Sequence, residues 1–302
     1  MPHVAFVPFT GLRVGSEEML EFGMSLPGLQ ARGKTLGELP ALGLLTLAGM
    51  LPDEWSCSYH PSASTDTLIE EICKTSPDIV AISALTASVE EAYRLCGQLS
   101  ALNIRTVLGG LHATTMPDES LLHSDAVCIG DGEGVWAQIL REVLDRSLRP
   151  VYQASKVFDF VLSPLPRFEL LPKRSVPRWT LQTQRGCPWA CEFCGASRLL
   201  GPPRFKPVDL LRRELNAIHS IDSTPWIELA DDNTLAGRNN PRELLQMLGE
   251  FNIRYFTECD WRVGDWVISP IAISKSIATT ILETFQLVRC RISAGYDERY
   301  GT

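Results

Sequence analysis

The 302-residue sequence lacks a surplus of basic residues. It has 28 Lys and Arg against 36 Asp and Glu, which gives a formal net charge of −8. A nucleic-acid surface would need a basic stripe. No apolar run reaches the roughly 20 residues that span a bilayer, and residues 1–15 lack the pattern of a secretory signal. We therefore predict a cytoplasmic protein with no membrane span and no nucleic-acid partner.

Histidine is also scarce, and the cysteines lack a second closely spaced pair. Only five of the residues are His and nine are Cys. An odd number of cysteines with three at a metal-type spacing fits a reducing compartment better than a disulfide framework. The cysteines that stand singly among apolar residues are predicted to be small buried side chains: Cys57, Cys73, Cys96, Cys128, Cys259 and Cys290.

The remaining three cysteines form the most informative feature of the chain. Cys187, Cys191 and Cys194 have the spacing C-x3-C-x2-C in the run RGCPWACEFCG. Three thiolates on one loop can hold three irons of a cubane cluster and leave the fourth iron open. Soft thiolates also suit zinc, but a closed zinc site usually takes four ligands. A zinc site remains the alternative at this point.

This run resembles the cluster loop of the radical S-adenosylmethionine (SAM) enzymes. The resemblance implies that the three cysteines hold a 4Fe-4S cluster and that SAM binds the open iron. It also implies reductive cleavage of SAM to a 5′-deoxyadenosyl radical, with electrons from a low-potential donor such as a flavodoxin or ferredoxin. By the same resemblance Phe193 lies near the adenine of SAM, although a core aromatic is an equal interpretation.

Before residue 150, short apolar runs alternate with helical patterns. Such alternation is typical of a parallel sheet with crossover helices. Five strands are predicted, at 4–9, 57–60, 78–83, 105–108 and 125–129, with helices at 40–50, 65–75, 88–102 and 134–144. We therefore predict an α/β fold with a doubly wound, Rossmann-like domain over residues 1–149. Ligands of such sheets bind beyond the carboxyl ends of the strands.

Glycine and polar residues gather where the predicted strands end. The segments GGLHAT and IGDGEG resemble the cobalamin-binding domain that precedes many radical SAM cores, which implies cobalamin as a second cofactor. The candidate cofactor residues there are Ser83, Thr86, Gly109, Gly110, His112, Gly130, Gly132 and Glu133. A D-x-H-x-x-G run, which in some cobalamin domains supplies a histidine to cobalt, is absent after the first strand. We predict that cobalamin binds without a protein histidine on cobalt.

The second half of the chain is predicted to begin with a proline-rich linker, residues 150–178. A partial radical SAM (β/α) barrel should follow over 179–266, with strands at 179–184, 226–230 and 254–258 and helices at 208–220 and 241–251. Asp231 and Asp232 follow the second of these strands, where acids face the active site of a barrel. Helix capping or a solvated turn is an equal interpretation of the two acids. The family resemblance places Asp231, Asp232, Glu258 and Arg262 around SAM.

The resemblance fades after Trp266, and residues 267–302 form a divergent segment. We therefore expect a barrel that looks truncated at the C-terminus. The leading hypothesis is a cobalamin-binding radical SAM enzyme that methylates, cyclises or rearranges an unactivated carbon of a small-molecule substrate. An inactive cobalamin and iron-sulfur carrier and a zinc-stapled binding protein are the two alternatives.

Overall fold

The computed structural model describes residues 1–9, 40–61, 65–171, 178–189, 191–251 and 253–259. Their contacts divide them into two compact units. The first runs to Thr180 and includes Asn216–Ile221, and the second contains Leu181–Leu215 and the described residues from Asp222 onward. Each unit is described by itself below.

The first unit is built on a six-stranded sheet of order β2-β1-β3-β4-β5-β6 in which all paired strands are parallel. Its strands are β1 (His3–Phe9), β2 (Ser56–Tyr59), β3 (Ile79–Ala84), β4 (Thr106–Gly109), β5 (Ala126–Ile129) and β6 (Val151–Gln153). Its helices are α3 (Leu42–Gly49), α4 (Thr65–Thr75), α5 (Val89–Ala101), α6 (Leu111–Thr115), α7 (Pro117–Leu121) and α8 (Trp136–Leu144). Short 3-10 turns are η1 (Thr86–Ser88), η2 (Gly132–Gly134), η3 (Phe160–Leu162) and η4 (Phe168–Leu170).

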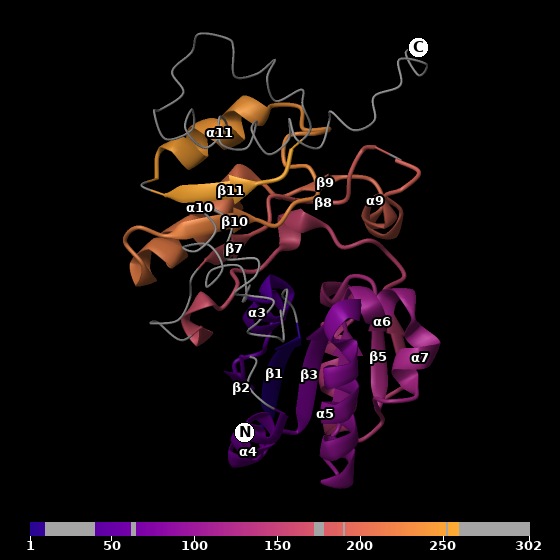
Figure 1. Cartoon of the computed structure of the whole chain (residues 1–302). Coiled ribbons are helices and arrows are strands. Elements are labelled where there is room, and N and C mark those ends of the chain that lie inside the picture. Colours follow the sequence, from indigo (N-terminus) through magenta and orange to yellow (C-terminus); the bar gives the residue numbers. More distant parts are fainter. Residues whose placement is uncertain (10–39, 62–64, 172–177, 190, 252, 260–302) are drawn as a thin grey trace, which may run out of the picture. The chain divides into compact units, whose positions relative to one another are not determined.

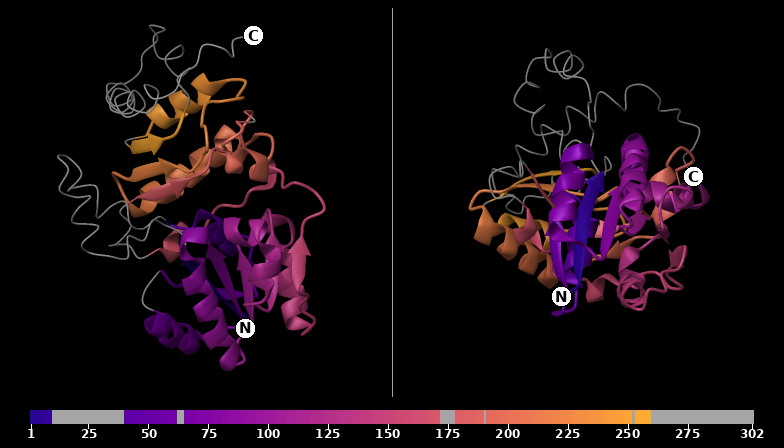
Figure 2. Two further views of the ribbon diagram at one scale, coloured as in Figure 1. Left: turned by 45° about the vertical axis from the view of Figure 1, so that its right-hand side comes forward. Right: turned by 90° about the horizontal axis from the view of Figure 1, so that it is seen from below.

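Helices cover both faces of this sheet (Figures 1 and 2). Side chains alternate between the faces of a strand, so Val4 and Phe6 of β1 pack with α3 and α8, whereas Ala5 and Val7 pack with α4 and α5. On the first face the rings of Phe6 and Trp136 lie 5.8 Å apart. The predicted α/β, Rossmann-like fold is thus confirmed.

The sixth strand was not predicted. It lies in the segment that was interpreted as an interdomain linker, and it pairs with β5 through Val127 and Val151. Tyr152, its central residue, is buried, and the Tyr152 hydroxyl donates to Glu142 Oε2 at 2.6 Å. Phe160 and Phe168 farther along this segment are also buried. The prediction of five strands was therefore one strand short.

The described chain from Trp179 onward contains two smaller sheets. Strands β10 (Trp226–Leu229) and β11 (Arg254–Thr257) are parallel, and they form a three-stranded sheet of order β11-β10-β7 with β7 (Trp179–Leu181). The strand predicted over 179–184 is interrupted, because β8 (Gln184–Arg185) leaves β7 and pairs antiparallel with β9 (Arg204–Phe205). The helices are α9 (Gly195–Leu200), α10 (Val208–Ile221) and α11 (Pro241–Gly249). The strand–helix alternation supports the barrel prediction, but closure of a barrel stays a prediction.

Candidate functional site

The three cysteines lie on the loop between β8 and α9. Cys191 is exposed, while Cys187 and Cys194 are half-buried. Cys194 is the residue just before α9, and its carbonyl accepts a hydrogen bond from the Ser197 hydroxyl at 3.2 Å. All three thiols therefore belong to one short, accessible segment.

The surroundings of these thiols differ. Hydrogen bonds from the backbone N–H of Ser197 and, to a smaller extent, from the Ser197 hydroxyl lower the pKa of Cys194, because hydrogen bonds to a thiolate favour the charged form. Burial raises the pKa of Cys187, and negative charge on Asp232, Cys191 and Cys194 raises it further. Cys187 thus lies within electrostatic range of the other two thiols. A cation at this loop would favour all three thiolates.

The described residues contain no group of three or more His, Cys, Asp or Glu that could hold a metal ion. A single zinc ion needs its thiolates converged at about 2.3 Å from one point. A cubane cluster takes each cysteine on a different iron, so its ligands stand farther apart. Three thiols on one common loop suit the chemistry of such a cluster.

Phe193 is not a core aromatic, because its side chain is 92% exposed. Such exposure of a large apolar ring on the cysteine loop leaves it accessible to a bound ligand. Glu258 follows β11 and is exposed, and its carbonyl accepts a hydrogen bond from Thr234 N at 3.0 Å. Arg262 lies outside the described residues.

The two acids after β10 have different surroundings. Asp231 is 4% exposed and accepts hydrogen bonds from the backbone of Thr183 and Gln184. Asp232 is exposed, and its charge acts on Cys187. Only Asp232 therefore has the exposure expected of a ligand-side group, and a solvated turn is not the environment of Asp231.

At the carboxyl edge of the first sheet, the loops after β3 and β4 meet. Gly110 has φ +95°, and a Cβ there would lie 2.9 Å from both Ala84 O and Ser83 Oγ, so only glycine suits this approach. His112 Nδ1 lies 3.1 Å from Thr86 Oγ1. The structure thus brings together the polar and glycine residues predicted after these two strands.

The loop after β5 joins the same edge. Gly130 has φ +78°, and its N–H donates to Thr114 Oγ1 at 3.0 Å, which ties the loop to α6. Glu133 in η2 is buried, and Gly132 packs close to Leu47 of α3. The glycine-rich loops after β4 and β5 are therefore neighbours at one edge of the sheet, which is where a doubly wound fold binds its ligand.

Both ring nitrogens of His112 are engaged inside the protein. The ring is 4% exposed, with Nε2 2.9 Å from the Tyr93 hydroxyl and Nδ1 at Thr86. A histidine that ligates cobalt needs one nitrogen free for the metal. This arrangement supports the prediction that cobalamin binds without His112 on cobalt. His112 instead links its own segment to Thr86 and Tyr93.

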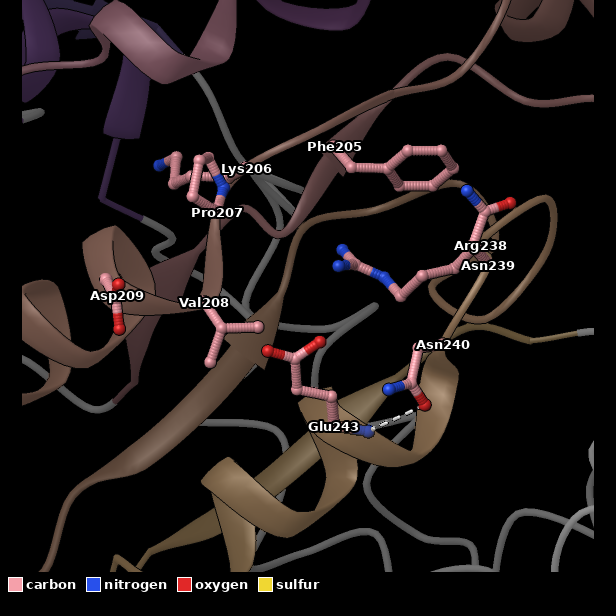
Figure 3. A pocket seen from close by; sticks show the side chains of 9 residues that line it. All are labelled: Phe205, Lys206, Pro207, Val208, Asp209, Arg238, Asn239, Asn240 and Glu243. Carbon is pink, nitrogen blue, oxygen red and sulfur yellow. Dashed lines mark hydrogen bonds between the residues drawn. The ribbon is translucent and has the colours of Figure 1, made fainter.

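The second unit also has a pocket of about 410 Å³ (Figure 3). It is formed by the end of β9, the first turn of α10 and the start of α11, and its lining residues are Phe205, Lys206, Pro207, Val208, Asp209, Arg238, Asn239, Asn240 and Glu243. Sequence reasoning identified none of these residues. No local pattern marks them, because they come from separate segments that only the folded chain brings together.

The N-terminal half of the chain matches a family model. Residues 30–140 match the B12 binding domain. This match covers the glycine-rich loops after β4 and β5 and confirms the cobalamin-binding type of Rossmann-like fold. No helix among the described residues is long and apolar enough to cross a membrane.

Curated relatives match more of the chain. It is 28% identical over 239 residues to an uncharacterized methyltransferase of Synechocystis, covering 75% of this chain and 44% of the relative. It is 24% identical over 222 residues to the bacteriochlorophyllide d C-12(1)-methyltransferase of Chlorobaculum tepidum, covering 71% and 48%. It is 25% identical over 221 residues to the hopanoid C-2 methylase of Rhodopseudomonas palustris, covering 72% and 41%. The chain thus spans less than half the length of these relatives.

Taken with the B12 binding domain, these relatives support the resemblance drawn from the cysteine loop. The chain fits a cobalamin-binding radical SAM protein, and its similarity to named methyltransferases supports an enzyme of that kind.

Proposed function

We propose that this protein is a radical SAM methyltransferase in which Cys187, Cys191 and Cys194 hold a 4Fe-4S cluster. SAM would bind the open iron, and cobalamin would bind to the N-terminal unit. The methyl acceptor would be an unactivated carbon of a small molecule. The observation that carries this proposal is the three-cysteine loop in a chain that also contains a B12 binding domain. When bound, the cluster, SAM and the corrinoid supply one-electron cleavage and methyl transfer.

The residues of the chain then bind and orient these groups. Hydrogen bonds from Ser197 favour the Cys194 thiolate, which is the ligating form. The exposed ring of Phe193 is accessible to the adenine of SAM. Asp232 and Glu258 are exposed carboxylates that can accept hydrogen bonds from the SAM ammonium or ribose. Arg262 remains proposed for the same site on the family resemblance alone.

In the first unit, Gly109, Gly110, Gly130 and Gly132 would let the backbone approach a flat corrinoid closely. Ser83, Thr86 and Glu133 would supply polar contacts at the same edge. The relatives named above act on different compounds, so the substrate class stays open. A low-potential flavodoxin or ferredoxin as electron donor and a cytoplasmic location belong to the same proposal.

The test is anaerobic incubation of the 302-residue chain, loaded with cluster and cobalamin, with SAM and dithionite. Formation of 5′-deoxyadenosine is expected, and with cobalamin as the methyl acceptor S-adenosylhomocysteine is also expected. Formation of 5′-deoxyadenosine should be lost in a variant with all three cysteines changed to Ala. Methylated product, as opposed to 5′-deoxyadenosine alone, would distinguish methyl transfer from cyclisation or rearrangement. A loaded protein that leaves SAM intact would instead be a cofactor carrier.

A further inference from the structure

Asp231 lies at the centre of a buried hydrogen-bond network. Its Oδ1 accepts from Thr183 N at 2.7 Å and from Gln184 N at 3.0 Å. Its Oδ2 accepts from Thr183 Oγ1 at 2.6 Å and from Thr234 Oγ1 at 2.9 Å. An ionised carboxylate has about four acceptor sites. The acceptors of Asp231 are therefore used within the protein.

Thr183 links this carboxylate to Arg238. The Arg238 Nη2 group donates to Thr183 O at 2.9 Å and to Thr183 Oγ1 at 3.1 Å. A hydroxyl has one hydrogen, so accepting from Arg238 leaves that hydrogen for Asp231. Burial raises the pKa of Asp231, and the hydrogen bonds from Thr183, Gln184 and Thr234 oppose that rise by favouring the ionised carboxylate. Burial lowers the pKa of Arg238, and the negative charges of Asp231 and Glu243 partly oppose that effect.

Arg238 is itself held from outside the network. Its guanidinium carbon lies 4.9 Å from the centre of the Phe205 ring. This distance is within the range of a cation–π contact. Figure 3 shows both side chains in the lining of the pocket. Phe205 belongs to β9, whose partner β8 begins at Gln184. Arg238 thus contacts residues 183–185 in two ways, directly at Thr183 and indirectly through β9, which pairs with β8.

Residues 183–185 lead directly into the cysteine loop, because Gln184 and Arg185 are followed by Gly186 and Cys187. Thr183 and Gln184 are fully buried. Gln184 Nε2 donates to Asn233 O at 2.7 Å, and Lys206 N donates to Thr183 O at 2.9 Å. The chain before the first cysteine is therefore fixed by the segment that follows β10, which is remote in sequence.

We propose that Asp231 is a positioning residue, which with Thr183 and Arg238 holds the start of the cysteine loop in register and does not contact SAM. The positioning role of Asp231 follows from the hydrogen-bond network, and only the identity of the group that the loop binds rests on the proposed function. Asp232, which is exposed beside Cys187, remains the acid available to ligands.

Amide hydrogen exchange of the cluster-free 302-residue chain tests this proposal. Asp231→Ala removes both acceptor oxygens and with them all four hydrogen bonds, so exchange at Thr183 and Gln184 should become roughly ten-fold faster while β3 of the first unit is unchanged. Asp231→Asn keeps one oxygen for the two backbone N–H groups and should restore slow exchange. Asp232→Ala is the matched control and should exchange like the wild type. If Asp231→Ala does not fold, Thr183→Val, which removes the bridging hydroxyl at nearly constant volume, should also accelerate exchange.

Unchanged exchange in both Asp231→Ala and Thr183→Val would overturn the proposal. A second readout is the SAM dissociation constant of the cluster-loaded Asp231→Asn variant, which should stay close to that of the wild type. A loss of affinity of about ten-fold at unchanged iron content would identify Asp231 as a SAM ligand and would also overturn it. Because the exchange measurement needs no cluster, a wild-type chain that binds no iron would contradict the proposed function without affecting this result.

Discussion

Lys206 and Glu214 form a buried ion pair in the second unit. The Lys206 Nζ lies 2.6 Å from Glu214 Oε1, and the two side chains are only 3% and 2% exposed. Burial raises the pKa of Glu214, while the positive charge of Lys206 opposes that rise. Lys206 adjoins β9 and Glu214 lies in α10, so the pair joins the strand next to the cysteine loop to the following helix.

Removing one member of this pair should be costly, because the other would be left as an unpaired buried charge. We predict that Lys206→Met destabilises the protein by about 3–5 kcal/mol in urea unfolding. The double variant Lys206→Met/Glu214→Leu should recover most of the loss. Arg212→Gln, which breaks the exposed pair with Glu250, is the control and should change stability little. Equal losses in the single and double variants would contradict this account.

Two histidines of the first unit should make stability depend on pH. Ser58 Oγ lies 2.9 Å from His3 Nε2 and 2.7 Å from His60 Nε2. Burial lowers the pKa of both rings from 6.5, the His60 charge lowers that of His3 further, and Glu71 partly opposes the effect at His60. The pKa values of both histidines are lower in the folded state than in the unfolded state. The stability that the neutral rings contribute is therefore fully present above the unfolded-state pKa, and it is lost as the pH falls through the folded-state pKa values.

The prediction is that the free energy of unfolding decreases between about pH 7.5 and about pH 5.5. The variant His3→Asn/His60→Asn should show a shallower decrease over the same range in urea titrations followed by circular dichroism. An identical slope in the wild type and the double variant would show that other groups cause the dependence.

Gly186 should be required for the backbone conformation at the start of the cysteine loop. It has φ +85°, and a Cβ there would lie 2.4 Å from Gly201 O. Gly186→Ala should therefore cost more than the roughly 1–2 kcal/mol of a left-handed backbone alone and should reduce iron incorporation. Gly97→Ala in α5, where nothing lies within 4 Å of the new Cβ, should stabilise by about 0.5–1 kcal/mol. Full iron content in Gly186→Ala would contradict the prediction.

Cobalt should carry no histidine of this protein. Cobinamide lacks the nucleotide base of cobalamin, so any nitrogen splitting in the electron paramagnetic resonance spectrum of bound cob(II)inamide must come from the protein. We predict no such splitting, because His112 uses both nitrogens for Thr86 and Tyr93. Splitting that disappears in His112→Gln would show that the ring turns to cobalt.

The sequence predicts the first unit well because its strands are continuous apolar runs. Ile79 to Ile82, for example, are buried on both faces of the sheet, as an uninterrupted run indicates. Strand β6 was missed since it has three residues and only Tyr152 is buried. Its pairing with β5 depends on a tertiary contact that no local pattern carries.

The cysteine loop is likewise evident from spacing, whereas the surroundings of the acids are not. Asp231 and Asp232 are adjacent and identical in type, yet only Asp231 is enclosed by Thr183, Gln184 and Thr234. These partners come from segments up to 48 residues away. Periodicity cannot reveal such a network, because burial of a charge becomes possible only when the distant donors are assembled.

The central claim is that Cys187, Cys191 and Cys194 hold a cluster with one open iron. Its most direct test is the iron and acid-labile sulfide content after anaerobic reconstitution of the 302-residue chain, compared with the variant in which all three cysteines are Ala. The account predicts about four irons and four sulfides per wild-type chain and almost none in the variant. Equal iron in the two proteins, or zinc without sulfide in the wild type, would contradict it.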